Sequence, residues 1–119
     1  MEKELLNNVL QIQAQLRVLH WQTESYAEHN AFGMTYDTLD ELFDDLIEVY
    51  SGKYSRPKFG GMKQIAVADI DNIKVEPFID GLMDFFSNAF IADGDSELKN
   101  ICDEIKSALG KLKYLLTLK

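Results

Sequence analysis

Apolar residues recur at steps of three and four along most of this chain, which is the spacing of one face of an amphipathic helix. The pattern predicts four helices, over about residues 2–21, 26–51, 76–91 and 95–117. The clearest apolar stripe is in the first of them, formed by Leu5, Val9, Ile12, Leu16 and Leu19. We therefore expect an all-α protein.

The segments between the predicted helices differ in length and composition. A polar run at residues 22–25 makes a short turn, and Gly52 is suited to end the second helix. Another turn at residues 93–95 provides Asp95 as the N-cap of the fourth helix. Residues 53–74 are expected to be a long crossover, because three helix breakers interrupt them: Pro57, Gly60 and Gly61.

These lengths predict a topology. Helices joined by short turns are antiparallel, whereas the long crossover allows the third helix to run parallel to the second. The result is two antiparallel hairpins joined by a crossover, which is the arrangement of a ferritin-like four-helix bundle. With 119 residues, the chain is expected to form a single domain, 1–119.

Charge is distributed unevenly along the chain. The net charge is −8, and residues 1–50 hold ten acidic and only two basic side chains. This half would repel a phosphate backbone, so strong nucleic-acid binding is not expected. No apolar run is long enough to span a bilayer, and we expect no membrane association. The single cysteine, Cys102, is expected to be an inert core residue, and a cytoplasmic location is the default.

Two histidines and two acids form a candidate metal site. His20 and His29 lie close together around the first turn, and Asp44 and Glu48 are four residues apart on the second helix. Imidazole and carboxylate together suit iron, manganese or zinc. The helical period places both acids on the flank and outer side of their helix, so a second subunit must complete such a site. The other interpretation is a solvated acidic helix face beside a structural histidine.

A different set of side chains offers a cationic and aromatic surface for a small anionic ligand. Its members are Arg17, Trp21, Tyr54, Arg56 and Lys58. The alternative function is therefore a non-enzymatic, oligomeric binding module. Such a module would hold a nucleotide signal or contact a partner protein or a virion.

The spacing of the candidate metal ligands resembles that of the Dps family of mini-ferritins. In that family a histidine–tryptophan pair lies near the end of the first helix and a second histidine begins the next helix. An aspartate and a glutamate follow this second histidine by fifteen and nineteen residues. His20–Trp21, His29, Asp44 and Glu48 match these positions, whereas the family's acidic ligand four residues after the second histidine is replaced by Gly33.

The chain as a whole also resembles small, uncharacterised ferritin-like proteins of large tailed phages. The patterns Leu-His-Trp-Gln-Thr and Ser-Tyr-Ala-Glu-His carry this second resemblance. A phage-encoded protein would be found in the host bacterial cytoplasm or in the virion.

The Dps resemblance implies a function and assigns roles to the four matching residues. His20 and His29 would be iron ligands of one subunit, and Asp44 and Glu48 would come from its two-fold mate. The family oxidises ferrous iron at this site, usually with peroxide, and stores the ferric product inside a shell of subunits. We therefore expect a homo-oligomeric iron-binding protein, and the resemblance alone implies ferroxidase-type activity.

Overall fold

The computed structural model describes residues 2–90 and 94–118. It contains four α-helices and one short 3-10 turn: α1 (Glu2–Gln22), α2 (Tyr26–Lys53), η1 (Ile70–Asn72), α3 (Val75–Asn88) and α4 (Ser96–Leu115). No strand occurs in the described ranges, so the predicted all-α class is confirmed. None of the described helices is long and apolar enough to cross a membrane. The expected end of the third helix at 91 and the start of the turn at 93 lie outside the described residues.

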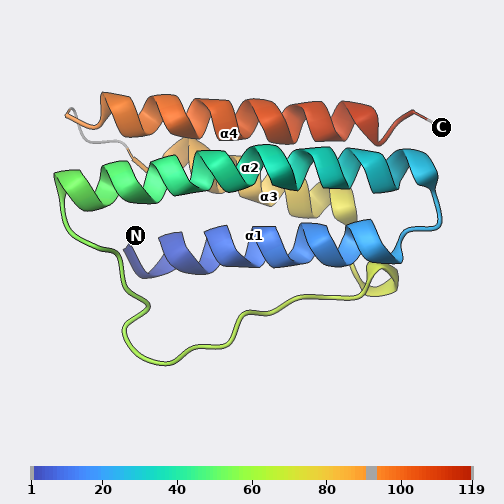
Figure 1. The fold of residues 1–119 in the computed structure, drawn as a ribbon, viewed down its shortest axis with the longest axis horizontal. Coiled ribbons are helices and arrows are strands. Elements are labelled where there is room, and N and C mark those ends of the chain that lie inside the picture. The colour runs from blue at the N-terminus through green and yellow to red at the C-terminus, as the bar shows by residue number, and fades with distance from the viewer. Residues whose placement is uncertain (1, 91–93, 119) are drawn as a thin grey trace.

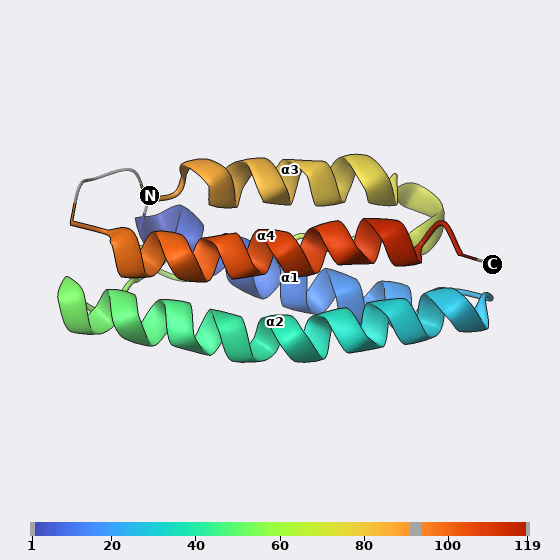
Figure 2. The ribbon, with the colours of Figure 1, turned by 90° about the horizontal axis from the view of Figure 1, so that it is seen from above.

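The four helices lie side by side along the long axis of the molecule (Figure 1). α1 and α4 run in one direction, whereas α2 and α3 run in the other (Figures 1 and 2). α2 packs against both α1 and α4, and α3 packs against α4. Because α2 and α3 both run from right to left in Figure 1, the segment between them returns along the whole bundle, beside α1.

The hydrophobic core lies between the helices, and the predicted stripe of α1 is buried at every position. In α3 the buried side chains are Ile79, Leu82 and Phe86, whereas their neighbours Phe78 and Phe85 are only partly buried. α4 also buries one face. It is formed by Leu98, Cys102, Ile105, Leu109 and Leu112.

Two helix ends differ from their predicted form. α2 continues through Gly52 to Lys53, and Tyr54 is the C-cap. Positive φ angles occur in the described ranges at Gly60 and Gly61, so Gly52 does not form a left-handed cap. Asp95 does occupy the N-cap position of α4, but its side chain makes no capping hydrogen bond.

The carboxylate of Asp95 instead binds the end of α2. It accepts a hydrogen bond from the Tyr54 hydroxyl and lies 3.1 Å from Nζ of Lys53. The same Nζ lies 2.9 Å from Oε1 of Glu97. Chiefly because of the Tyr54 hydrogen bond, the pKa of Asp95 is lowered from its usual 3.8. The end of α2 is therefore joined to the start of α4 by a charged network around a residue that is only 4% exposed.

The crossover is held against α1 by glutamine side chains. Gln15, which is 1% exposed, donates from Nε2 to the carbonyl oxygen of Ala68 and accepts from the Ala68 N–H, both at 2.8 Å. One turn earlier, Gln11 donates to the carbonyl of Ala66. At the end of α1, Gln22 accepts from the N–H of Ile70. These amides bind an extended backbone as a neighbouring strand would, because each offers both a donor and an acceptor.

Replacing Gln15 tests this attachment. Gln15→Ala leaves both backbone groups of Ala68 without their partners, so the free energy of unfolding should fall by about 1–3 kcal/mol. The measurement is urea denaturation followed by circular dichroism. Gln11→Ala is the matched control, since it removes a single, exposed hydrogen bond. Equal losses in the two variants would contradict the special role of Gln15.

The Asp95 network predicts a pH dependence. A carboxylate whose pKa is lowered by folding stabilises the native state above its unfolded pKa, here 3.8, and this contribution is lost as pH falls through the lower folded value. Asp95→Asn should therefore lower the urea midpoint at pH 7, and the difference from the unmodified chain should shrink below about pH 4. The control is Asp71→Asn, because Asp71 is exposed and makes no ion pair within residues 2–90 and 94–118. A difference that persists unchanged at low pH would exclude the charge of Asp95 as its cause.

Candidate metal site

The two histidines meet where α1 ends and α2 begins. Their imidazole rings are stacked, with centroids 3.7 Å apart and planes inclined by 17°. His20 Nδ1 lies 2.6 Å from the carbonyl oxygen of His29, and His29 Nδ1 lies 2.8 Å from the carbonyl oxygen of His20. The first hairpin is thus closed by two reciprocal contacts between a side chain and the backbone.

These contacts determine the tautomer of both rings. A carbonyl oxygen only accepts hydrogen bonds, so each Nδ1 must carry the hydrogen. In the neutral ring Nε2 then has a free lone pair, and neither Nε2 is hydrogen-bonded to a described residue. A metal-binding histidine commonly has this arrangement, in which the other ring nitrogen donates to a backbone carbonyl.

Gly33 makes room for the imidazole of His20. A Cβ at position 33 would lie 3.1 Å from Nδ1 of His20 and 2.8 Å from Cε1, and the second distance is shorter than a Cβ contact allows. The carbonyl of His29 is directed along the helix toward residue 33. Because Gly33 has no side chain, the Nδ1 of His20 can reach that carbonyl. An acidic side chain at position 33 would collide with the present ring position.

The two candidate acids lie far along α2 from the histidines. Fifteen residues separate His29 from Asp44, which corresponds to about 22 Å of helix. Asp44 and Glu48 are both exposed, and neither forms an ion pair within the described ranges. No group of three or more histidine, cysteine or acidic side chains among the described residues could hold a metal ion. One chain therefore brings the histidines together and leaves the acids apart from them.

A polar network continues from the histidines along α1 and α2. The ring of Tyr36 contacts His20 edge to face, and the guanidinium of Arg17 lies 4.5 Å from the Tyr36 centroid. Arg17 also donates to Asp40 at 2.8 Å, and Gln13 donates to the same carboxylate. No spacing rule within one helix points to Tyr36 or Asp40, because both contact side chains of the other helix, α1.

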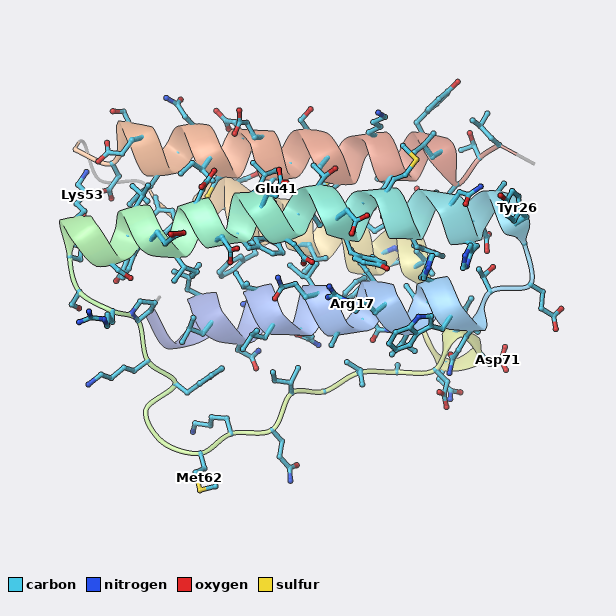
Figure 3. All side chains as sticks on the ribbon, viewed as in Figure 1. Arg17, Tyr26, Glu41, Lys53, Met62 and Asp71 are labelled. Atoms are coloured by element: carbon cyan, nitrogen blue, oxygen red, sulfur yellow. The ribbon has the colours of Figure 1, made fainter. Side chains whose placement is uncertain are left out.

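The structure separates the residues proposed for an anionic ligand. Arg17 is paired with Asp40, and Trp21 is exposed near the end of α1. Tyr54, Arg56 and Lys58 instead follow the far end of α2. Figure 3 shows this separation, with Tyr26 and Lys53 labelled at opposite ends of α2. The five residues therefore do not form one surface on a single chain.

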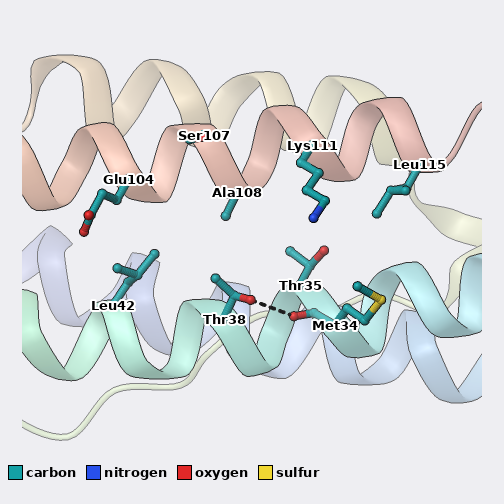
Figure 4. Close-up of a pocket in the computed structure, with 9 residues that line it drawn as sticks. All are labelled: Met34, Thr35, Thr38, Leu42, Glu104, Ser107, Ala108, Lys111 and Leu115. Atoms are coloured by element: carbon teal, nitrogen blue, oxygen red, sulfur yellow. Dashed lines mark hydrogen bonds between the residues drawn. The ribbon is translucent and has the colours of Figure 1, made fainter.

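Two other features contain candidate chemistry but no metal ligand set. A groove of about 380 Å³ lies between α2 and α4, with walls that include Met34, Leu42 and Leu115 (Figure 4). Its single acidic lining residue, Glu104, has no histidine beside it in the lining. Cys102 is buried, and this burial raises the pKa of its thiol to about 11. The thiol is therefore protonated at neutral pH, as expected for a core residue.

Substituting Gly33 tests the packing of His20. Alanine is favoured over glycine in a helix by about 1 kcal/mol, so Gly52→Ala, where the added Cβ meets no atom within 4 Å, should stabilise the chain by up to that amount. Gly33→Ala should stabilise it less, because the ring of His20 must leave the carbonyl of His29. Nitrogen-detected NMR of the rings should show the Nδ1–H tautomer of His20 in Gly52→Ala but not in Gly33→Ala. Identical stabilities and ring signals in both variants would contradict the close contact.

Comparison with known proteins assigns the chain to a family. Residues 20–116 match the family of unknown function DUF5856. A protein of Enterobacteria phage T4, described as an uncharacterized 14.6 kDa protein in the mobD-ri intergenic region, is 29% identical over 115 residues, covering 97% of this chain and 87% of that protein. No solved structure matches the chain. Because the family match covers more than half of the chain and includes both histidines, both candidate acids and the helices α2, α3 and α4, the chain belongs to the DUF5856 family.

Proposed function

We propose that this chain is an oligomeric, ferritin-like protein that binds ferrous iron between two copies. His20 and His29 of one copy and Asp44 and Glu48 of the other would be the ligands. The observation that carries this proposal is the hydrogen bonding of the histidines. Both Nδ1–H groups are occupied by backbone carbonyls, so both Nε2 atoms are free to bind a metal.

The course of the helices supports the ferritin-like part of the proposal. Two antiparallel hairpins are connected by a crossover that runs the length of the bundle (Figure 1). In folds of this type, metal-binding carboxylates and histidines are carried by facing helices.

Two exposed aromatic side chains near the first turn favour a second copy as the partner. Trp21 is 70% exposed and Tyr26 is 79% exposed, and they lie on either side of the turn between α1 and α2, close to the histidines in sequence. Burying large aromatic side chains is a common source of stability in interfaces. A two-fold contact in which α2 crosses α2 of the other copy in the opposite direction would bring the acids of each copy toward the histidines of its mate.

The ligand set suits iron more than it suits an alkaline-earth ion. Imidazole nitrogens with carboxylates are typical of iron, manganese and zinc sites, whereas calcium and magnesium prefer oxygen ligands alone. The two rings are nearly parallel, so their lone pairs do not converge on one point. Binding of one ion by both histidines would therefore turn one ring out of the stack. Oxidation of the bound ion by peroxide is the reaction that the Dps resemblance implies.

Anaerobic titration with ferrous iron tests the proposed site. His20→Ala and Glu48→Ala should each abolish the tight-binding component, because each removes a ligand from every site. Glu41→Ala is the matched control, since Glu41 is an exposed acid of the same helix outside the ligand set, and it should bind as the unmodified chain does. Oxidation is followed in parallel by the ferric absorbance after peroxide is added.

Mixing the two defective variants tests whether the site is shared between copies. In a mixed pair, the histidines of the Glu48→Ala chain face the intact acids of the His20→Ala chain, so one complete site is restored. Iron binding should therefore reappear on mixing, and native mass spectrometry should report it in the mixed pair. If the mixture binds no iron although mixed pairs form, the shared site is excluded.

A further inference from the structure

A second site of different chemistry lies at the other end of α2, where the crossover begins. A hollow there is lined by Ser51, Gly52, Tyr54, Ser55, Arg56 and Lys58. α2 has 28 residues, or about 42 Å of helix, so this hollow is far from the histidines at the start of α2. The hollow therefore shares no residue with the proposed iron site, whose acid Glu48 lies about one helical turn before Ser51.

The hollow is positively charged on a chain that is otherwise acidic. Its lining includes the guanidinium of Arg56 and the ammonium of Lys58 but no carboxylate. Neither cation forms an ion pair within residues 2–90 and 94–118. Their neighbour Lys53 differs, because Asp95 and Glu97 already neutralise it. Two unneutralised cations therefore share one concave surface.

A proline lies between the two cations and limits the backbone that carries them. Arg56 and Lys58 are two residues apart, and both side chains line the hollow. Pro57 lies between them and is absent from the lining. Its ring restricts its own φ and keeps the preceding residue extended. The relative positions of Arg56 and Lys58 are thus limited before any ligand binds.

Hydrogen-bond donors accompany the two charges. The backbone N–H groups of Ser55 and Arg56 make no hydrogen bond to the described part of the chain. Tyr54 has another role, because its hydroxyl donates to Asp95 and so anchors the base of the hollow to α4. A guanidinium, an ammonium and free amides are the groups that bind the oxygens of a phosphate.

We propose that this hollow is a binding site for a phosphate-bearing anion. Arg56 binds two of its oxygens and Lys58 contributes a second charge. The shared chemistry is a phosphate or diphosphate group, which occurs both in free inorganic phosphates and in nucleotides.

Titration of the full chain with inorganic pyrophosphate at about 0.15 M salt tests the proposal, followed by calorimetry and by amide NMR. Arg56→Ala should weaken binding by about tenfold or more, because it removes charge-assisted hydrogen bonds. Lys58→Ala should also weaken binding. The matched control is Lys63→Ala, which removes one charge from the same segment but lies outside the lining, and its affinity should change by less than about twofold. ADP titrated in parallel carries the same diphosphate, and tighter binding of ADP would identify the nucleotide as the source.

Three results would overturn the proposal. The first is the absence of saturable binding by the unmodified chain for both probes. The second is an equal loss of affinity in Lys63→Ala and Arg56→Ala, since binding would then reflect only the overall charge of the crossover. The third is amide shifts confined to residues outside 51–58. Circular dichroism of each variant checks that these exposed substitutions leave the helices intact.

Discussion

The contact between the imidazole of His20 and the backbone of α2 at Gly33 determines how the first hairpin closes. The carbonyl of His20 is among the last of α1, which have no partner within their own helix. His29 donates to this carbonyl, and His20 donates in return to the carbonyl of His29. The two rings can stack in this way only because residue 33 has no Cβ. The hairpin geometry, the tautomers and the free Nε2 atoms all follow from this one close approach.

α1 uses three different faces for three kinds of contact. One face supplies the core, a second binds the crossover through Gln11, Gln15 and Gln22, and a third faces α2 through Arg17 and His20. The crossover has little regular structure of its own, so its backbone groups depend on these glutamines. At the opposite end of the bundle, the Tyr54–Asp95 hydrogen bond holds the point where the crossover leaves α2. The histidines and the proposed phosphate site therefore lie at two ends of the bundle that are stabilised separately.

Local patterns predicted the helices well and their exact faces less well. In α1 one stripe is apolar and the rest is polar, so the buried side was unambiguous. In α3, adjacent phenylalanines at 85 and 86 are compatible with two buried faces, and the packing against α4 selected Phe86. Asp95 was correctly placed at the start of α4, but its preferred partners are Lys53 and Tyr54. Those partners are more than forty positions earlier in the chain, beyond the reach of any local rule.

The amino-acid sequence alone determined where the helices lie, which side of α1 is buried, and the spacing of the four candidate metal ligands. These properties depend on helical periodicity and on the positions of proline and glycine, which act over a few residues. The tertiary structure alone decided the tautomers of His20 and His29, the reason for Gly33, and the division of the basic and aromatic residues between two ends of the bundle. These depend on the distance and direction between helices, which are set by the packing of side chains from remote parts of the chain.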